Sequence, residues 1–451
     1  MANLKIKPFA YSFESFLKHY VNGGMLLMVV ALLAMVVANS PLSEAYTSFW
    51  NYPVSLQIGD FNLFSHHGEP MTLMAFINDA LMAIFFFSVG LEIKRETLVG
   101  ELSSFRQALM PIIAACGGMI IPVIIYSLMI TDGIGHHGLA IPMATDIAFS
   151  LGVLSLLGKR VPLSLKIFLT AFAVVDDIGG IIVIALFYAT NLEFGYLLAA
   201  AVIIVMLFFA NIKLEVVNKA FYIFWGIVVW YLFLQSGIHS TVAGVLVAFT
   251  IPSRPNLMIG KYIERIRENI HSFPVSKKES ILLDHNQLES LKSIESSSDH
   301  VISPLQSMED ALQAPVNYLI MPLFAFANAG VVFSGGGNEI VGEVTYAVAS
   351  GLLFGKFIGI FSFTWLAVKL KIGSLPEGMC WKNLAGVSML GGIGFTVALF
   401  IANLSFGSKA PELLNQAKFG IICGTVLSGI IGYIYLSKVL PKENLTDAEN
   451  L

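Results

Sequence analysis

Two adjacent carboxylates, Asp176 and Asp177, lie near the middle of segment 169–188, whose other residues are almost all apolar or small. A run of this length and character is typical of a membrane-spanning helix. A charged side chain at the centre of a bilayer costs about 2.5–3.5 kcal/mol on insertion scales. An acidic pair at that depth therefore predicts an ion or proton site.

A second set of polar residues interrupts the apolar segment 139–158, where Pro142 is followed by Thr145 and Asp146. Proline removes a backbone donor, and a buried aspartate needs partners, so an unwound stretch lined by protein and water is expected there. A merely kinked helix is the alternative, but a kink does not account for Asp146.

A third feature is the glycine cluster Gly391, Gly392 and Gly394, which precedes Thr396 in the apolar segment 384–403. Each glycine weakens a helix by about 1 kcal/mol relative to alanine. Close packing of small residues between helices would also explain the cluster. Together with the first interruption, however, it predicts two broken helices, one in each half of the chain, and such pairs point to a transport site.

Lys356 is the single basic residue that we place inside an apolar segment. A buried lysine is either neutral or paired with a carboxylate. Adjacent residues of a helix point about 100° apart, so Asp176 and Asp177 cannot easily serve one small partner together. We expect one of them to face Lys356 and the other to face an ion. Asp146 and Lys356 would also balance the partial charges at the ends of the broken helices.

The composition is that of a membrane protein. Of the 451 residues, 56% are hydrophobic and only 12% charged, and the mean hydropathy is +0.77. These values exceed those of soluble globular proteins. The three cysteines match no metal-ligand spacing and are interpreted as small apolar residues. The histidine pairs 66–67 and 136–137 have no supporting ligands, so no metal site is predicted there.

Twelve apolar runs approach the roughly 20 residues needed to cross a bilayer, which predicts an all-α membrane protein with twelve transmembrane helices. Their approximate cores are 23–40, 72–92, 108–130, 139–158, 165–188, 196–211, 221–235, 238–251, 316–333, 346–368, 384–403 and 417–437. The stretch 221–251 is a single long helix if the break at 235–237 is ignored.

The placement of Lys and Arg supports this count, because cytoplasmic loops are enriched in them. With the N-terminus inside, 23 of the 26 basic residues fall in inner segments, only Lys409 and Lys418 fall in outer segments, and Lys356 lies within a span. We therefore predict that both termini are cytoplasmic.

The spans divide the chain into five regions. A cytoplasmic N-terminus, 1–22, precedes spans one to eight, 23–251; a cytoplasmic insertion, 252–315, precedes spans nine to twelve, 316–437, and a cytoplasmic C-terminus, 438–451. Alternating residues around Gly59 and Asp60 predict an outer hairpin over about 53–64. The insertion is interpreted as a solvated spacer or a regulatory segment, with a short helix around 281–294.

Several of these segments together resemble the NhaA-type sodium/proton antiporter family. The resemblance is carried by FINDALMAIFFFSVGLEIKRE at 76–96, AIPMATDIAFSLGVLSLLGKRVPLSLKIFLTAFAVVDDIGGIIVIALFY at 140–188, SGIHSTVAG at 236–244, MPLFAFANAGV at 321–331, GLLFGKFIGI at 351–360, and LPEG, GGIGFT and FIANLSFG within 375–407. It covers nearly the whole chain and both interrupted spans. The long insertion departs from the compact members of the family.

The resemblance implies roles for the polar residues. Asp177 is implied as the principal cation and proton carboxylate, Asp176 as the neighbour that pairs with Lys356, and Thr145 and Asp146 as the polar groups of the broken helix. Asp79 is implied as an accessory acid. Positions linked in the family to pH response are Glu92, Glu96, His239 and Glu309.

The resemblance also implies inverted repeats in spans 3–5 and 10–12, two broken crossing helices, and a homodimer formed through the outer hairpin. It implies a transporter of a bacterial-type inner membrane, not an enzyme, which exchanges two protons for one Na⁺ or Li⁺ in pH and sodium homeostasis. No cofactor and no nucleic acid partner are expected. Two other readings stay open: a sodium-coupled symporter of an organic acid, and an intramembrane aspartyl protease, whose acids come from separate helices and share a proton.

Overall fold

The computed structural model describes residues 23–441 except 59–60, 63, 67–68, 132, 190–191, 255–258, 274–282, 334–340, 377 and 408. The predictions made for the two cytoplasmic termini beyond these limits, and for Gly59 and Asp60, lie outside the described residues.

In the described part of the chain, seven helices are long and apolar enough to cross a membrane. They are Leu73–Val99 (α4, Leu73–Phe76; a π-helical turn, Ile77–Leu81; α5, Met82–Val99), α6 (Phe105–Met129), α8 (Leu163–Phe187), α9 (Phe194–Ile212), α10 (Lys219–Ser236), Glu343–Lys369 (α16, Glu343–Ser350; a π-helical turn, Gly351–Gly355; α17, Lys356–Lys369) and α20 (Pro411–Val439).

Three bent pairs of helices raise this number to as many as ten. They are α2 (Gly23–Ala38) with α3 (Ser43–Trp50), bent by 113°; Gly135–Met143, which holds two 3₁₀ segments, with α7 (Ile147–Ser155), bent by 43°; and α18 (Trp381–Leu390) with α19 (Phe395–Ser405), bent by 44°. The chain is thus an all-α membrane protein. Each of the twelve predicted spans contains a helix in the described structure, whereas the number of crossings stays a prediction.

Two predicted spans remain. The eighth corresponds to a short apolar helix, α11 (Thr241–Thr250), and the ninth to the second part of a continuous run of α14 (Pro304–Pro315), a π-helical turn (Val316–Ile320) and α15 (Met321–Asn328). The predicted border at 315/316 therefore falls inside a helix. Hydropathy missed the first part of this helix because one of its faces carries Glu309, Asp310 and Gln313, which line a polar cavity.

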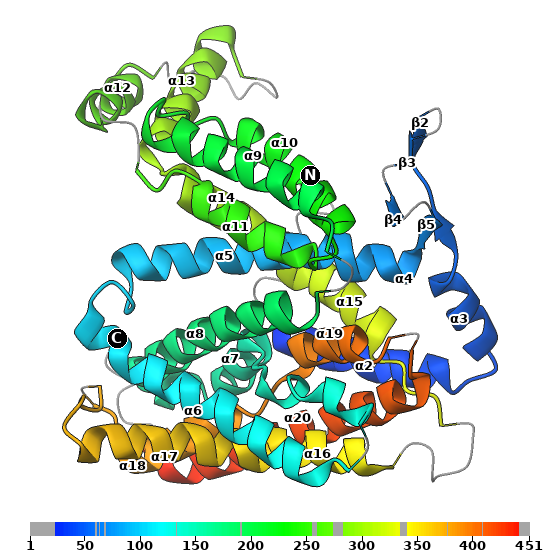
Figure 1. Cartoon of the computed structure of the whole chain (residues 1–451). Helices are drawn as coiled ribbons and strands as arrows, with labels where there is room; N and C mark the ends of the chain where they lie inside the picture. Colours follow the sequence, from blue (N-terminus) through cyan, green and yellow to red (C-terminus); the bar gives the residue numbers. More distant parts are fainter. Residues whose placement is uncertain are drawn as a thin grey trace, which may run out of the picture.

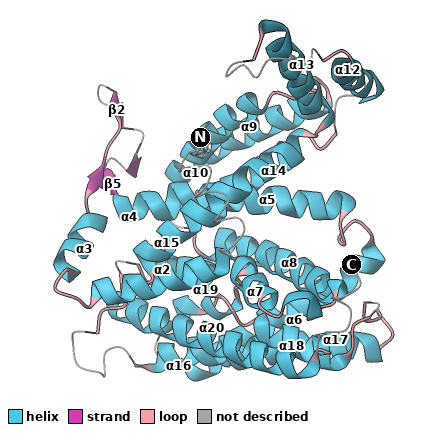
Figure 2. Ribbon diagram, turned by 180° about the vertical axis from the view of Figure 1, so that it is seen from behind, coloured by secondary structure: helices cyan, strands magenta, loops and turns pink. Residues whose placement is uncertain are grey.

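The helices form two groups with α5 between them (Figure 1). Helices α9, α10, α11 and α14 lie on one side of α5, and α6 to α8 and α16 to α20 lie on the other; the view from behind shows the same arrangement (Figure 2). Within the second group, α6 and α17 touch at Gly117 and Gly359, where a Cβ on Gly359 would lie 2.1 Å from the carbonyl oxygen of Gly117. Only glycine permits this approach.

Short strands occupy the stretch in which a hairpin is predicted, and they continue beyond it to Thr72. Strands β2 (Gln57–Ile58) and β3 (Phe61–Asn62) pair antiparallel, and β5 (Glu69–Thr72) pairs with both β1 (Pro53–Val54) and β4 (Ser65–His66). This unit projects beside α3 and α4 (Figure 1).

Apart from α14, the described residues of the insertion form two helices, α12 (Ile259–His271) and α13 (His285–Val301), which are joined by a hydrogen bond from Asn269 Nδ2 to Ser293 Oγ of 3.1 Å. They project away from the membrane helices (Figure 1). Helix α13 begins after the predicted 281, with Asp284 as its N-cap, and extends past the predicted 294. The backbone N–H of Leu305 donates to the carbonyl of Pro252 at 3.1 Å, so the two ends of the insertion are adjacent.

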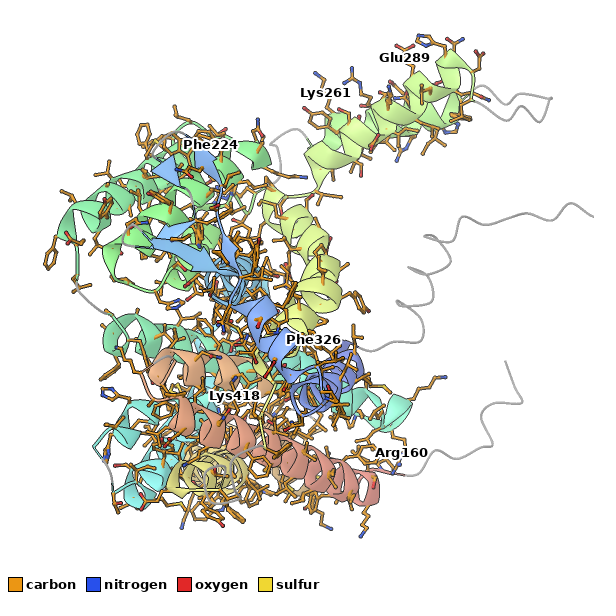
Figure 3. All side chains as sticks on the ribbon, turned by 90° about the vertical axis from the view of Figure 1, so that its right-hand side faces the viewer. Arg160, Phe224, Lys261, Glu289, Phe326 and Lys418 are labelled. Atoms are coloured by element: carbon orange, nitrogen blue, oxygen red, sulfur yellow. The ribbon has the colours of Figure 1, made fainter. Side chains whose placement is uncertain are left out.

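One basic residue is placed differently from the sequence interpretation. Lys418, which we assigned to an outer segment, lies within α20 and is only 7% exposed (Figure 3). The core of the last span was drawn from 417, which left Lys418 at its outer edge, whereas the helix begins at Pro411 and places this residue well inside it. The described chain therefore buries two lysines, Lys356 and Lys418, inside membrane helices.

Candidate functional site

The two interrupted helices meet at Asp146, which is the N-cap of α7. Its Oδ1 accepts from the backbone N–H of Phe149 at 3.0 Å. Its Oδ2 accepts from the backbone N–H of Thr396 at 3.1 Å and from the hydroxyl of Thr396 at 2.6 Å, in the first turn of α19. One buried carboxylate thus satisfies the free N–H groups, and faces the positive ends, of two half-helices.

Three further hydrogen bonds join the two breaks. The backbone N–H of Asp146 donates to the carbonyl of Ile393 at 2.7 Å, and the hydroxyl of Thr145 donates to the carbonyl of Gly391 at 3.0 Å. The hydroxyl of Ser150 donates to the carbonyl of Leu390 at 3.1 Å. The carbonyls freed by the glycine-rich break are therefore bonded by the other broken helix, which makes unwound backbone tolerable inside a membrane.

The adjacent aspartates on α8 have different surroundings. The ammonium of Lys356 donates to Asp176 Oδ2 at 2.6 Å, and neither side chain is exposed. Lys356 also lies 5.5 Å from the centre of the Phe172 ring. Asp176 Oδ1 is buried without a hydrogen-bond donor among the described residues. Asp177, which points elsewhere, lines a cavity.

This cavity has a volume of about 250 Å³ and a mixed polar lining. Its buried polar lining residues form the floor: Asp177, Asp146, Thr145 and Thr396. Its partly or fully exposed polar lining residues form the mouth: Ser88, Glu92, Arg95, Glu309, Asp310, Gln313 and Asn317. Five carboxylates and one cation line the cavity, so its field attracts cations and repels anions.

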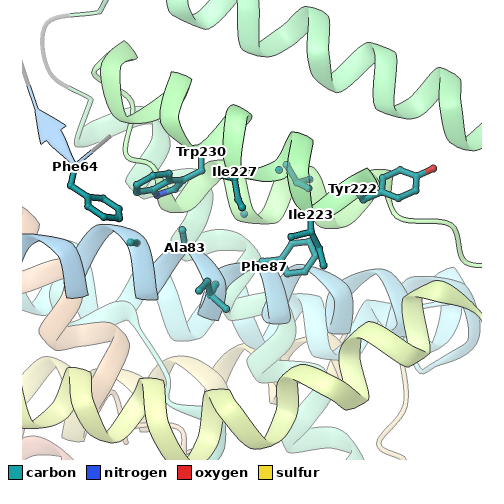
Figure 4. Close-up of a pocket in the computed structure, with 12 residues that line it drawn as sticks. Phe64, Ala83, Phe87, Tyr222, Ile223, Ile227 and Trp230 are labelled. Carbon is teal, nitrogen blue, oxygen red and sulfur yellow. The ribbon is translucent and has the colours of Figure 1, made fainter. Parts of the chain in front are cut away.

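A second cavity, of about 340 Å³, lies between α5 and α10 and has a different character (Figure 4). Its lining is apolar, with Phe64, Phe87, Ile227 and Trp230 prominent, and the hydroxyl of Tyr222 points away from it. It offers no ligand for an ion. The polar cavity is therefore the candidate site.

Arg95 organises the mouth of the polar cavity. Its guanidinium forms ion pairs with Glu309 at 2.7 Å and with Glu96 at 3.0 Å. Burial raises the pKa of Glu309 above that of a free glutamate, although Arg95 opposes this shift. Lys94 caps the C-terminal end of α11 by donating to the carbonyls of Phe249 and Ile251.

Two of the predicted polar residues lie elsewhere. His239 Nε2 is 3.3 Å from Asp79 Oδ1, and the hydroxyl of Ser240 also donates to this oxygen, at 3.2 Å. Asp79 sits in the π-helical turn before α5, six residues before Phe85, the first residue of that helix that lines the cavity. The structure therefore gives Asp79 and His239 a site of their own.

The structure brings together most of the residues singled out in the sequence: Asp177, Thr145, Asp146, Glu92 and Glu309 in the cavity, Asp176 and Lys356 as a pair beside it, and Glu96 at Arg95. Sequence reasoning missed Thr396 as a partner of Asp146, although its place directly after the glycine break mirrors that of Asp146. It also missed two neutral amides in the lining: Gln313, which was assigned to the insertion, and Asn317, which lies within the predicted ninth span.

Chemically, the floor offers carboxylate and hydroxyl oxygens, which are the ligands that hard cations prefer. Protonation removes the charge of a carboxylate and with it most of the attraction for a cation. Asp177 is the floor carboxylate not engaged by a described cation or by the two helix ends, so it is the group most available for such competition.

Comparison with known proteins gives consistent results. A family model described as Na⁺/H⁺ antiporter 1 matches residues 14–436. The Na(+)/H(+) antiporter NhaA of Phocaeicola vulgatus is 64% identical over 445 residues, which cover 98% of this chain and 99% of the relative. Those of Bacteroides thetaiotaomicron and Helicobacter pylori are 63% identical over 422 residues (93% and 96%) and 46% identical over 429 residues (94% and 94%).

Proposed function

Because the chain belongs to the Na⁺/H⁺ antiporter 1 family, we propose that the polar cavity is the exchange site of a sodium/proton antiporter and that Asp177 is the carboxylate at which the two ions compete. The chain is a multi-pass bacterial membrane protein and a transporter, not an enzyme. The observation that carries the proposal is the separation of the adjacent acids: Asp176 is held by Lys356 at 2.6 Å, while Asp177 lines the cavity.

The proposed reaction is a competition at one site. Deprotonated Asp177 binds Na⁺ or Li⁺ with the help of the hydroxyl of Thr145 and the field of Asp146, and protonation of Asp177 releases the cation. The same carboxylate cannot hold a proton and a metal cation at once. If the site changes its exposure from one side of the membrane to the other only with one of them bound, the flow of Na⁺ is coupled to the flow of protons.

A second proton comes from the ion pair. When a cation approaches Asp177, it competes electrostatically with Lys356 for the charge of Asp176, the next residue on α8. If Lys356 then gives up its proton, two protons exchange for one Na⁺ and the cycle moves net charge. Such a cycle would use the proton gradient for pH and sodium homeostasis.

The proposed topology has twelve crossings with both termini in the cytoplasm of a bacterial inner membrane. The cavity then opens to the cytoplasm, because its mouth lies beside Lys94 and Arg95. Spans 3–5 and 10–12 are proposed as inverted repeats that contain the two broken helices, and their movement against the other spans would alternate access. A homodimer through the strand unit β1 to β5 and the assignment of pH response to Glu92, Glu96, His239 and Glu309 are further proposals.

The geometry counts against both alternatives. An organic anion would meet five carboxylates and one arginine in a cavity of about 250 Å³. A protease dyad needs two carboxyl groups that share a proton, whereas Asp176 is bonded to Lys356.

The test is transport by the purified protein in proteoliposomes that hold a pH gradient. Added Na⁺ should collapse the gradient with the unaltered protein and with the control Glu343→Gln, which removes an exposed carboxylate, but not with Asp177→Asn. Exchange retained in Asp177→Asn would refute the site, and no exchange with any alkali cation in the unaltered protein would refute the function. The ratio of protons to Na⁺ follows from the membrane potential at which known Na⁺ and proton gradients produce no net exchange.

A further inference from the structure

Three helices continue past the floor of the polar cavity, away from its mouth. The last residues of these helices that line the cavity are Phe85 on α5, Met321 on α15 and Val397 on α19. From the mouth at Arg95, α5 runs towards lower residue numbers, whereas α15 and α19 run towards higher ones. Whatever closes the far side of the site must come from the next turns of these helices.

The first layer, at the floor and just beyond it, is aromatic, with Phe400 at its centre. Phe400 lies one turn past Val397 and is completely buried. Its ring centre lies 5.6 Å from that of Phe86 on α5, 6.4 Å from that of Phe324 on α15 and 5.1 Å from that of His239. The three helices are thus joined by apolar contacts that exclude water from the path beyond the floor.

The second layer is a ladder of three asparagines, one from each of the same helices. Asn403 Nδ2 donates to Asn328 Oδ1 at 2.8 Å, and Asn328 Nδ2 donates to Asn78 Oδ1 at 2.8 Å. Asn328 has no exposed surface. Each asparagine lies six or seven residues past the last cavity-lining residue of its helix, which places the ladder about 10 Å beyond the floor at 1.5 Å per residue.

The chemistry of this ladder suits a contact that breaks and re-forms. The amides are neutral, so their separation leaves no unpaired charge in the membrane. Asn403 and Asn328 each also donate to a carbonyl of their own helix, those of Leu399 and Phe324. An interhelical hydrogen bond in a membrane protein changes an equilibrium by about threefold on average, which is large enough to bias two states and small enough to be reversed.

We propose that the Phe400 layer and the Asn78–Asn328–Asn403 ladder form the gate that closes the ion site on the side away from the cavity mouth. Asn403 lies on α19, one of the two broken helices, whereas Asn328 and Asn78 lie on α15 and beside α5. Exposure of Asp177 to the far side requires α19 to move away from α15, and the Asn328–Asn403 bond breaks in that step. The proposal rests on the proposed exchange function.

The first test measures exposure directly. In a background with Cys116, Cys380 and Cys423 replaced by alanine, Ser88→Cys reports on the open cavity, and Ala327→Cys, at a position 2% exposed beside Asn328, reports on the far side. Adding Asn403→Leu, which keeps the side-chain size, should raise the rate of maleimide labelling at 327 in purified protein about threefold or more, without raising the rate at 88. The control Ser405→Ala breaks a bond to Tyr188 on the α8 side and should change neither rate.

An unchanged rate at 327 in Asn403→Leu overturns the gate, and equal increases at both positions indicate general loosening and overturn it as well. The second measurement does not depend on that variant. In Asn328→Cys/Asn403→Cys, Cd²⁺ should bridge the two thiolates and stop Na⁺-driven proton release, and a chelator should restore it; either single variant should be insensitive.

Exchange that continues while radiolabelled Cd²⁺ stays bound to the double variant shows that the ladder need not open and overturns the proposal. These outcomes are distinguishable from failure of the proposed function. If the unaltered protein exchanges no alkali cation, the function is refuted, but the labelling rates at 88 and 327 still decide whether Asn403 closes the far side.

Discussion

The strongest test of the electrostatics is the removal of Lys356. Lys356→Met keeps the length of the side chain but leaves Asp176 buried without its partner. Both side chains are fully buried and the ion pair is 2.6 Å long. Breaking a buried pair by removing one partner costs about 3–5 kcal/mol, because the remaining charge is uncompensated.

This cost converts to a measurable shift in melting temperature. At about 2.1 cal/mol/K of unfolding entropy per residue, a chain of 451 residues has about 0.9 kcal/mol/K. Lys356→Met should therefore lower Tm by about 3–5 °C in a fluorescence-based thermal assay of the detergent-solubilised protein. The matched control is Lys369→Met on the same helix, whose ammonium lies over the Trp365 ring at an exposed position and should shift Tm by less than about 1 °C.

A double variant separates charge from packing. In Asp176→Asn/Lys356→Met no charge is left, so most of the lost stability should return, even though transport should stay impaired. Replacement of a buried pair by neutral groups is often neutral or stabilising. Our reasoning would be refuted if Lys356→Met melted like the unaltered protein, or if the double variant melted no higher than Lys356→Met.

Three further changes test other parts of the structure. Thr396→Val removes the 2.6 Å hydrogen bond to Asp146 and should cost about 1.5–3 kcal/mol in thermal stability. Gly359→Ala forces a Cβ against the facing carbonyl of α6 and should lower Tm by several degrees, whereas Gly180→Ala, with open space around it, should not. Because burial raises the pKa of Glu309, its contribution to stability is complete below about pH 4.5 and is lost as the pH rises through the raised value. Glu309→Gln should flatten this part of a plot of Tm against pH.

Each of these predictions has a contrary outcome. A Tm unchanged in Thr396→Val would mean that Asp146 does not depend on the second helix for its hydrogen bonds. Equal shifts in Gly359→Ala and Gly180→Ala would show that loss of glycine flexibility, rather than close approach, sets stability. An identical pH profile with and without Glu309 would show that its carboxyl group titrates alike in folded and unfolded protein.

The separation of Asp176 from Asp177 could be predicted because charged residues are rare in apolar runs and because neighbours on a helix point in different directions. The two broken helices could be predicted because proline and glycine weaken a helix at the position where they occur, whatever the rest of the fold. In the structure Asp176 pairs with Lys356 and both predicted breaks are bends between helices, whereas the roles of these residues in transport stay predictions.

Other parts of the site leave no such local signal. Asn328 and Asn403 are single neutral amides in apolar helices, and only the fold brings them together. The acids of α14 belong to a segment of low hydropathy, so its role as one wall of the cavity depends on tertiary packing. The π-helical turns, one of which holds Asp79, have no recognisable pattern in the sequence.

The adjacent ends of the insertion make it a replaceable module. Since the backbone of Leu305 bonds to that of Pro252, the intervening segment leaves and rejoins the membrane helices at one point. Helices α12 and α13 pack on each other rather than forming a wall of the ion cavity. A short turn can therefore replace this segment. A rigid fusion partner can instead be grafted between these two residues, to enlarge the particle and serve as a fiducial marker in electron microscopy. In both cases the ion site keeps its geometry.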